Sequence, residues 1–187
     1  MHKVAKSLKL PLDSEEIRTL RAGDMVSLTG SVLTARDAAH KKLVELIESK
    51  GALPFQLEGQ AVFYAGPCPA PPGFEVGSIG PTTSARMDAY SPFLMRHGIK
   101  VMIGKGPRSR EVKEAIAEFG GLYLIAVGGI AALMSRRVKK SEVLAFQELG
   151  AEAVRWLEIE SMPLVVGVDS YGRDVYEMRG GGWGEGG

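Results

Sequence analysis

The spacing of hydrophobic residues changes along the chain, from the two-residue period of strands to the 3.6-residue period of helices and back. Apolar runs and apolar–polar alternation predict strands over residues 2–9, 25–33, 61–65, 99–103, 122–127, 154–159 and 164–168. Helical spacing predicts helices over residues 35–50, 82–96, 109–119, 130–134 and 141–149. Strands and helices alternate in the second half, which favours a parallel sheet, whereas the first half has more strands joined by turns. We therefore expect one α/β domain with additional β structure, and not a symmetric barrel.

The first long helix carries signals at both of its ends. Thr34 is a typical N-cap residue, and Asp37 occupies the capping-box position that follows it. Gly51 ends the helical pattern. Arg36 is thus expected in the first turn of a helix that follows a strand. Taken alone, Arg36 is either a cation for a ligand or an ordinary surface residue.

Composition and charge exclude several classes of protein. Apolar residues make up 45% of the 187 residues and charged residues 24%, as in a soluble globular protein. The 23 Lys and Arg residues balance 22 Asp and Glu residues, so no large basic surface for nucleic acid is expected. Residues 180–187 are nearly all glycine and predict a flexible tail after a domain of residues 1–179.

The sequence contains no signal for a membrane segment, a signal peptide or a disulfide bond. No apolar run approaches the roughly 20 residues that span a bilayer, which predicts no membrane segment. Lys3, Lys6 and Lys9 interrupt the N-terminal residues, so no signal peptide is expected and the cytoplasm is the predicted location. Cys68 is the single cysteine, which excludes an internal disulfide and an iron–sulfur cluster held by this chain alone.

A glycine-rich turn follows the predicted strand 99–103. Its sequence, Gly104-Lys-Gly-Pro-Arg-Ser109, partly resembles a dinucleotide-binding fingerprint, but Ser109 replaces the third glycine. The order of its residues also differs from that of a phosphate-binding P-loop. Lys105 nevertheless lies at the carboxyl end of a predicted parallel strand, where open α/β sheets bind ligands.

The segment Gly80-Pro-Thr-Thr-Ser-Ala-Arg86 is the most unusual motif of the chain. Three consecutive hydroxyl side chains at a predicted helix start would lie beside free N–H groups, which suits an anion. Arg86 follows Thr82 by one helical turn, so both could face one pocket. The alternative is a threonine-capped helix with a surface arginine.

Several motifs in this order resemble one family, the β subunit or C-terminal domain of class I iron–sulfur fumarate hydratases and the similar L-tartrate dehydratases. The motifs are Thr34-Ala-Arg-Asp-Ala-Ala-His40, Tyr64-Ala-Gly-Pro-Cys-Pro-Ala70, Gly80-Pro-Thr-Thr-Ser-Ala-Arg-Met-Asp88, Gly104-Lys-Gly106 and Leu164-Val-Val-Gly-Val-Asp169. The resemblance covers nearly the whole chain. It implies a swivelling β/β/α fold with a partly parallel sheet. It also implies a partner, an α subunit that ligates a [4Fe–4S] cluster, and the start at Met1 just before the first strand suits a separate β subunit.

The resemblance also implies a reaction and roles for four residues. The reaction is the reversible addition of water to fumarate to give L-malate, at a site shared by the two subunits. Arg36, Arg86 and Lys105 match the substrate-binding cations of the family, and Thr82 matches a threonine proposed as the base that removes the C3 proton. Two readings remain as alternatives: an L-tartrate dehydratase β subunit, and a non-catalytic anion-binding scaffold. A homo-oligomer of the isolated chain is compatible with either.

Overall fold

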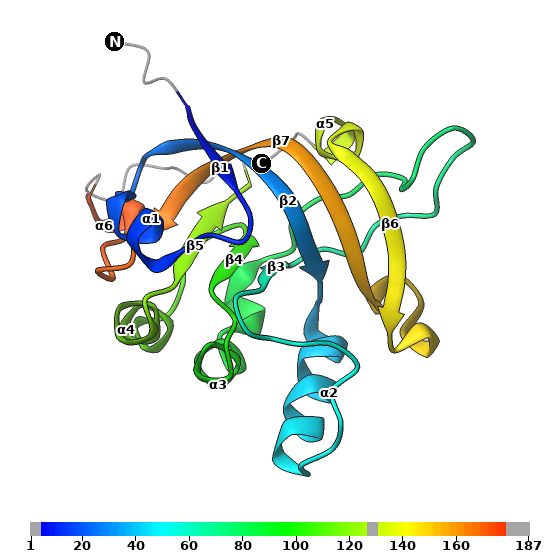
Figure 1. Cartoon of the computed structure of the whole chain (residues 1–187), viewed down its shortest axis with the longest axis horizontal. Coiled ribbons are helices and arrows are strands. Elements are labelled where there is room, and N and C mark those ends of the chain that lie inside the picture. Colours follow the sequence, from blue (N-terminus) through cyan, green and yellow to red (C-terminus); the bar gives the residue numbers. More distant parts are fainter. Residues whose placement is uncertain (1–4, 127–130, 179–187) are drawn as a thin grey trace.

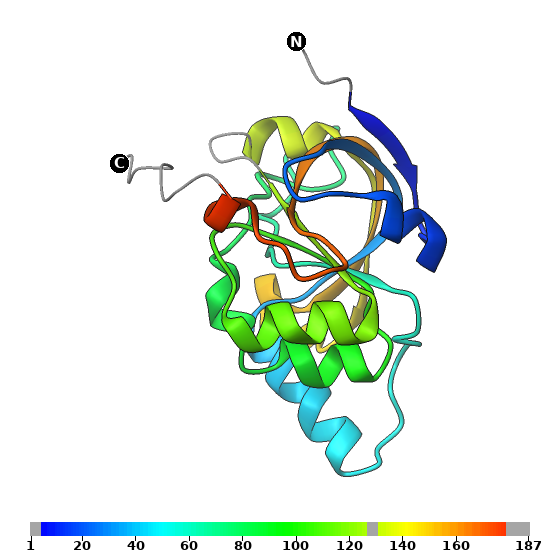
Figure 2. The same cartoon turned by 90° about the vertical axis from the view of Figure 1, so that its left-hand side faces the viewer.

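The computed structural model describes residues 5–126 and 131–178, and in them five strands close into a ring (Figures 1 and 2). The ring consists of β2 (Met25–Thr34), β3 (Ala61–Phe63), β4 (Val101–Gly104), β5 (Leu122–Ile125) and β7 (Val154–Val168). The pairs β2–β3, β3–β4 and β4–β5 are parallel, whereas β7 closes the ring by pairing antiparallel with β5 and β2. Two further strands, β1 (Lys6–Lys9) and β6 (Val138–Ala145), pair with β2 and β7.

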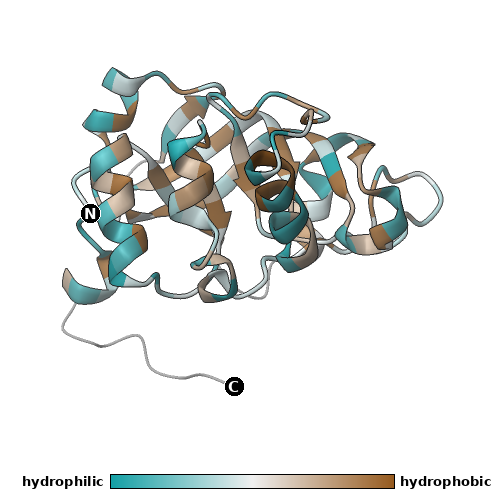
Figure 3. Ribbon diagram, turned by 90° about the horizontal axis from the view of Figure 1, so that it is seen from below, coloured by the Kyte–Doolittle hydropathy of each residue, from teal (hydrophilic) through white to brown (hydrophobic). Residues whose placement is uncertain are grey.

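Three helices cover one side of this sheet, namely α2 (Asp37–Glu48), α3 (Ser91–Arg96) and α4 (Arg110–Phe119) (Figures 1 and 2). Seen from that side, teal and brown residues alternate around the helices, as amphipathic helices require (Figure 3). One core cluster fills the ring, and a second lies between the sheet and the helices. The shorter helices are α1 (Ser14–Thr19), η1 (Ser84–Met87), α5 (Ala131–Arg136), η2 (Gln147–Glu152) and α6 (Val175–Met178).

Gly30 lets the segment that follows β1 pack closely against β2. Gly30 of β2 has φ +127°, and a Cβ atom there would lie 2.8 Å from the Cβ atom of Leu10. Gly30 also follows a shift in the β2–β7 register. Only glycine tolerates both the positive φ and the close approach. The resulting bulge bends β2 around the core.

The predicted fold class is confirmed: the chain is a mixed α/β protein with a partly parallel sheet and additional strands. The closed ring was not foreseen, but its three parallel and two antiparallel pairings make it asymmetric. The predicted strands 154–159 and 164–168 form one strand, β7, in which Ser161 has φ +51°. The predicted tail and the ends of the predicted segments at 2–4, 127 and 130 lie outside the described residues.

Three local predictions are wrong. Residues 141–149 are not a helix, because β6 pairs with β7 up to Ala145 and a 3-10 helix follows. Residues 82–96 are not one helix, because Pro81 and Thr83 bridge to Ala65 and Lys105 before η1 and α3 begin. Thr34 does not cap α2: it belongs to β2, and its hydroxyl accepts a hydrogen bond from the Arg155 amide at 3.2 Å.

Candidate functional site

A cavity of about 220 Å³ lies beyond the carboxyl ends of neighbouring parallel strands. Arg36 follows β2, Gly66 follows β3 and Lys105 follows β4. The remaining lining residues, Gly80, Pro81, Thr82 and Thr83, lie at the far end of the same β3–η1 connection that contains Gly66. In α/β sheets, whether open or closed, ligands bind at the carboxyl ends of the parallel strands, because loops from several strands converge there. The cavity therefore joins Arg36, Thr82 and Lys105, three of the four residues predicted from the sequence.

The segment that carries Thr82 lies across the ends of β3 and β4 as an extended chain. The amide of Thr82 donates to the Tyr64 carbonyl at 2.7 Å, and the amide of Ser84 donates to the Lys105 carbonyl at 2.9 Å. These two amides are bonded to carbonyl oxygens, so the prediction of free N–H groups beside the hydroxyls is wrong for them. An anion here would be held by side-chain cations and hydroxyls instead of by these amides.

Arg36 enters the cavity from the N-terminus of α2. Its Nε atom is buried without a hydrogen-bond partner and lies 3.6 Å from a carboxylate oxygen of Glu152. Gly66 provides the room for this side chain, since a Cβ atom there would lie 3.3 Å from Cδ of Arg36 and 2.7 Å from the Ala151 carbonyl oxygen. The 29% exposure of the Arg36 side chain leaves its outer guanidinium accessible to a carboxylate.

Lys105 is exposed, and within the described residues no acidic side chain forms an ion pair with it.

Arg86, in contrast to Lys105, forms an ion pair within the chain. Arg86 does not line the cavity, and its Nε and Nη2 atoms contact the two carboxylate oxygens of Asp37 at 3.0 and 2.9 Å. Asp37 directly follows Arg36, so this pair lies beside the Arg36 backbone. The structure thus places Arg86 next to the site, but bound to a carboxylate of the chain itself.

A buried ionic network behind the cavity was missed by sequence reasoning. Arg108 is 5% exposed, and its Nε donates to Asp88 at 2.7 Å. Its Nη2 donates to Ser91 at 2.7 Å and to the Tyr64 hydroxyl at 3.3 Å. The second oxygen of Asp88 accepts the Ser109 amide at 2.7 Å. Asp88 and Arg108 lie in the two motifs already identified, but local patterns do not show that an arginine in a glycine-rich turn is buried.

His40 lies beneath Arg36 and outside the cavity. Its Nδ1 atom is 2.8 Å from the Arg36 carbonyl oxygen, and the ring is only 2% exposed. Burial lowers the pKa of His40 from 6.5 to about 4, although the bond to the Arg36 carbonyl opposes this shift. His40 is therefore neutral at neutral pH and fixes the start of α2.

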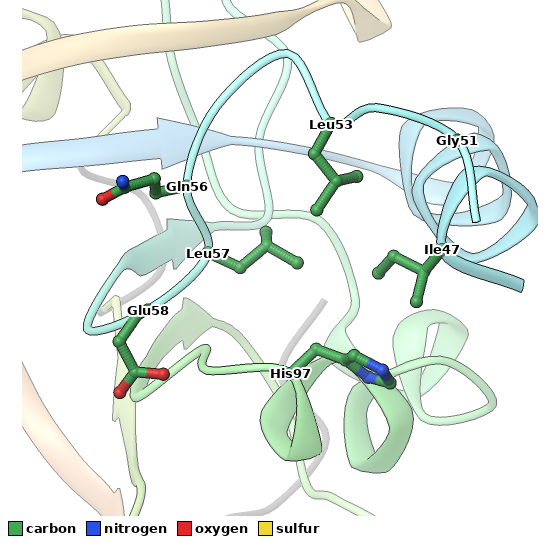
Figure 4. A pocket seen from close by; sticks show the side chains of 7 residues that line it. All are labelled: Ile47, Gly51, Leu53, Gln56, Leu57, Glu58 and His97. Carbon is green, nitrogen blue, oxygen red and sulfur yellow. The ribbon is translucent and has the colours of Figure 1, made fainter.

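A larger groove of about 460 Å³ has a different character (Figure 4). It is lined by Ile47, Gly51, Leu53, Gln56, Leu57, Glu58 and His97. Leu53, Leu57 and Ile47 point into it from the end of α2 and the following loop (Figure 4). Its lining includes neither Arg nor Lys, so it does not suit a small diacid.

The described residues contain no group of three His, Cys, Asp or Glu side chains arranged to hold a metal ion. Cys68 is exposed in the proline-rich loop and is the single cysteine of the sequence. This set of donors does not fit an iron–sulfur cluster, which needs several thiolates. None of the helices in the described part of the chain is long and apolar enough to cross a membrane.

Comparisons with known proteins show the family to which the chain belongs. The family model described as "Fumarase C-terminus" matches residues 2–179. The anaerobic class I fumarate hydratase of Escherichia coli K12 is 42% identical over 155 residues, which are 82% of this chain and 28% of that enzyme. Fumarate hydratase 2 of Leishmania major is 38% identical over 177 residues, 92% of this chain and 31% of that enzyme. The β subunit of L(+)-tartrate dehydratase from E. coli K12 is 35% identical over 175 residues, 91% of this chain and 86% of that subunit. The chain thus spans about a third of these fumarate hydratases.

Proposed function

Because the chain belongs to the fumarase C-terminus family, we propose that it is the β subunit of a hydro-lyase that reversibly hydrates fumarate to L-malate. The proposed site is shared with an α subunit that ligates a [4Fe–4S] cluster. The observation that carries the proposal is the convergence of Arg36, Thr82 and Lys105 on one cavity. The two cations would bind the carboxylates of a diacid, and the hydroxyl group would remove the proton.

Each cation has a distinct role in the proposal. Arg36 presents a planar guanidinium, which binds one carboxylate of the substrate through two parallel hydrogen bonds. Lys105 supplies a mobile point charge for the same or the second carboxylate. Arg86 remains a substrate-binding residue of the assembled site, because its side chain is 51% exposed and Asp37 contacts only its Nε and Nη2 atoms.

Thr82 is the proposed base for the C3 proton. A hydroxyl group is a weak base unless nearby positive charge lowers its pKa. Arg36 and Lys105 line the same cavity as Thr82 and provide that charge. When bound by the partner, the cluster would supply a Lewis acid for the leaving hydroxyl group. This chain would then orient the carboxylates and hold the proton at the Thr82 oxygen.

The test is an assay of the chain alone and combined with its cluster-bearing α subunit. We expect turnover of fumarate only by the combination. Arg36→Ala and Lys105→Met should each raise KM or abolish turnover, whereas Arg96→Ala, at the exposed end of α3, should not. Turnover by the isolated chain, or full activity of both cavity variants, would contradict the proposal.

A second candidate substrate is L(+)-tartrate. The specific observation in its favour is the match along 86% of the E. coli tartrate dehydratase β subunit. Both substrates are C4 diacids that differ in their hydroxyl groups, so the same cations would bind either one. Parallel assays with both acids decide between them, and inactivity towards both in the presence of the α subunit would favour the scaffold alternative.

A further inference from the structure

The hydroxyl group of Tyr123 links two of the segments that line the cavity, the one that ends in Ser84 and the one that contains Lys105 and Gly106. Tyr123 belongs to β5 and is fully buried. Its hydroxyl donates to the Gly106 carbonyl at 2.8 Å and is 2.8 Å from the hydroxyl oxygen of Ser84. A phenol has one proton to donate, so the Ser84 hydroxyl must be the donor in the second bond. The result is a chain of hydrogen bonds from Ser84 through Tyr123 to Gly106.

The two ends of this chain are close to the proposed site residues. Ser84 follows Thr82 by two positions, and Gly106 directly follows Lys105. The backbone adds a second link, because the Ser84 amide donates to the Lys105 carbonyl at 2.9 Å. Ser84 is fully buried against Gly104, where a Cβ atom would lie 2.0 Å from its hydroxyl oxygen. Ser84 is thus held in place on two sides, and Thr82 is held with it.

The ring of Tyr123 has little freedom to move. The guanidinium carbon of Arg108 lies 4.8 Å from the ring centroid, and Arg108 is itself bound to Asp88. A Cβ atom at Gly167 of β7 would lie 2.9 Å from Cδ1 of the ring, so β7 also packs closely against it. Burial raises the pKa of the Tyr123 phenol, which therefore stays protonated. The hydroxyl is a fixed donor at all pH values near neutrality.

We propose that Tyr123 is a positioning residue, whose buried hydroxyl group sets the distance between Thr82 and Lys105 without touching the substrate. This inference rests on the proposed function, since it assigns Thr82 and Lys105 to one reaction. Catalysis requires the base and the bound carboxylate to be correctly spaced, and a shift of about 1 Å can reduce turnover about 100-fold. Loss of the hydroxyl should therefore reduce kcat more than it raises KM.

The test uses the complex of this chain with its α subunit and measures steady-state hydration of fumarate. Tyr123→Phe keeps the ring and removes the link. We expect kcat to fall about 10-fold or more while KM changes less than about 3-fold. Ser84→Ala should have a similar effect, and the double variant should be no worse than either single variant, because both remove the same link.

Tyr64→Phe is the matched control. It removes another buried phenol hydroxyl from the same core but leaves the link between Ser84 and Gly106 intact. We expect its kcat to stay within about twofold of the wild type. A second readout uses the isolated chain: hydrogen exchange at the Ser84 amide should accelerate in Tyr123→Phe while global stability changes little.

The possible failures are distinct. If the wild-type complex hydrates fumarate and Tyr123→Phe keeps the same kcat and the same protection of the Ser84 amide, the positioning role is wrong and the proposed function stands. Additive losses in the double variant would also overturn the inference, because they would show that the two hydroxyl groups act separately. An inactive wild-type complex would refute the proposed function, and the inference would fall with it.

Discussion

Removal of the Asp88 carboxylate is expected to destabilise the fold strongly. Arg108 has a side-chain exposure of 0%, and Asp88 is its only acidic partner among the described residues. Asp88→Ala leaves that guanidinium buried without a counter-charge, and breaking a buried pair in this way costs about 3–5 kcal/mol. It also removes the acceptor of the Ser109 amide, which begins α4. For a chain of this length such a loss lowers the melting temperature by roughly 6–20 °C.

The assay is urea unfolding followed by circular dichroism, together with thermal unfolding. A double variant, Asp88→Ala with Arg108→Met, separates the charge from the packing. Replacing both partners by uncharged residues should restore at least about 2 kcal/mol relative to Asp88→Ala, because no charge then remains buried. A loss below about 1 kcal/mol for the single variant would show that the pair behaves like an exposed one. A double variant as unstable as the single variant would refute the electrostatic explanation.

Three further predictions concern the pH dependence of stability, the packing at Gly104 and the ion pair between Arg86 and Asp37. The folded pKa of His40 is about 4 against 6.5 for an unperturbed histidine, so the unfolded chain gains a proton there first as pH falls. The stability that neutral His40 contributes is complete above pH 6.5 and is lost as the pH falls towards 4. Over that range the free energy of unfolding of the wild type should fall by about 3 kcal/mol more than that of His40→Gln. Titration of the His40 ring at pH 6.5 in NMR spectra would contradict this. Gly104→Ala should lower stability by about 1–3 kcal/mol in urea unfolding, because its Cβ atom would lie 2.0 Å from the Ser84 hydroxyl, and an unchanged midpoint would refute the predicted clash. Asp37→Asn should loosen Arg86 and change KM for the diacid without lowering stability by more than about 1 kcal/mol, since the pair is partly exposed; an unchanged KM would argue against a substrate contact by Arg86.

The elements that sequence reasoning predicted well depend on local signals. Helix α4 begins after Ser109, whose hydroxyl accepts the Val112 amide, and ends at Gly120 in the left-handed conformation. Both residues act within one turn of the helix they delimit, so the sequence alone reveals them. The short strands β4 and β5 are continuous apolar runs and are equally local signals.

The elements that were missed depend on distant partners. Residues 138–145 form a strand because β7 satisfies their backbone groups, and their own sequence alternates poorly between buried and exposed positions. Thr34 has the chemistry of a cap, but its hydroxyl is used by the Arg155 amide from across the sheet. In both cases tertiary pairing overrides local preference.

In the candidate site, too, some residues could be predicted from local signals and others depend on distant partners. Lys105 could be assigned to the carboxyl edge of the sheet from its place after a parallel strand, and Arg36 and Thr82 could be assigned to the candidate site from the family resemblance. The pairing of Arg86 with Asp37 joins residues 49 positions apart, and no local pattern indicates it. The burial of Arg108 is equally non-local, since its partners come from Tyr64, Asp88 and Ser91.

The most direct test of the proposed function is a crystal structure of this chain assembled with the proposed cluster-bearing α subunit and a bound C4 diacid. We expect the Arg36 guanidinium and the Lys105 ammonium to lie within hydrogen-bonding distance of the ligand carboxylates, with the Thr82 hydroxyl facing C3. A diacid bound entirely by the partner, or bound in the apolar groove beside His97, would contradict it.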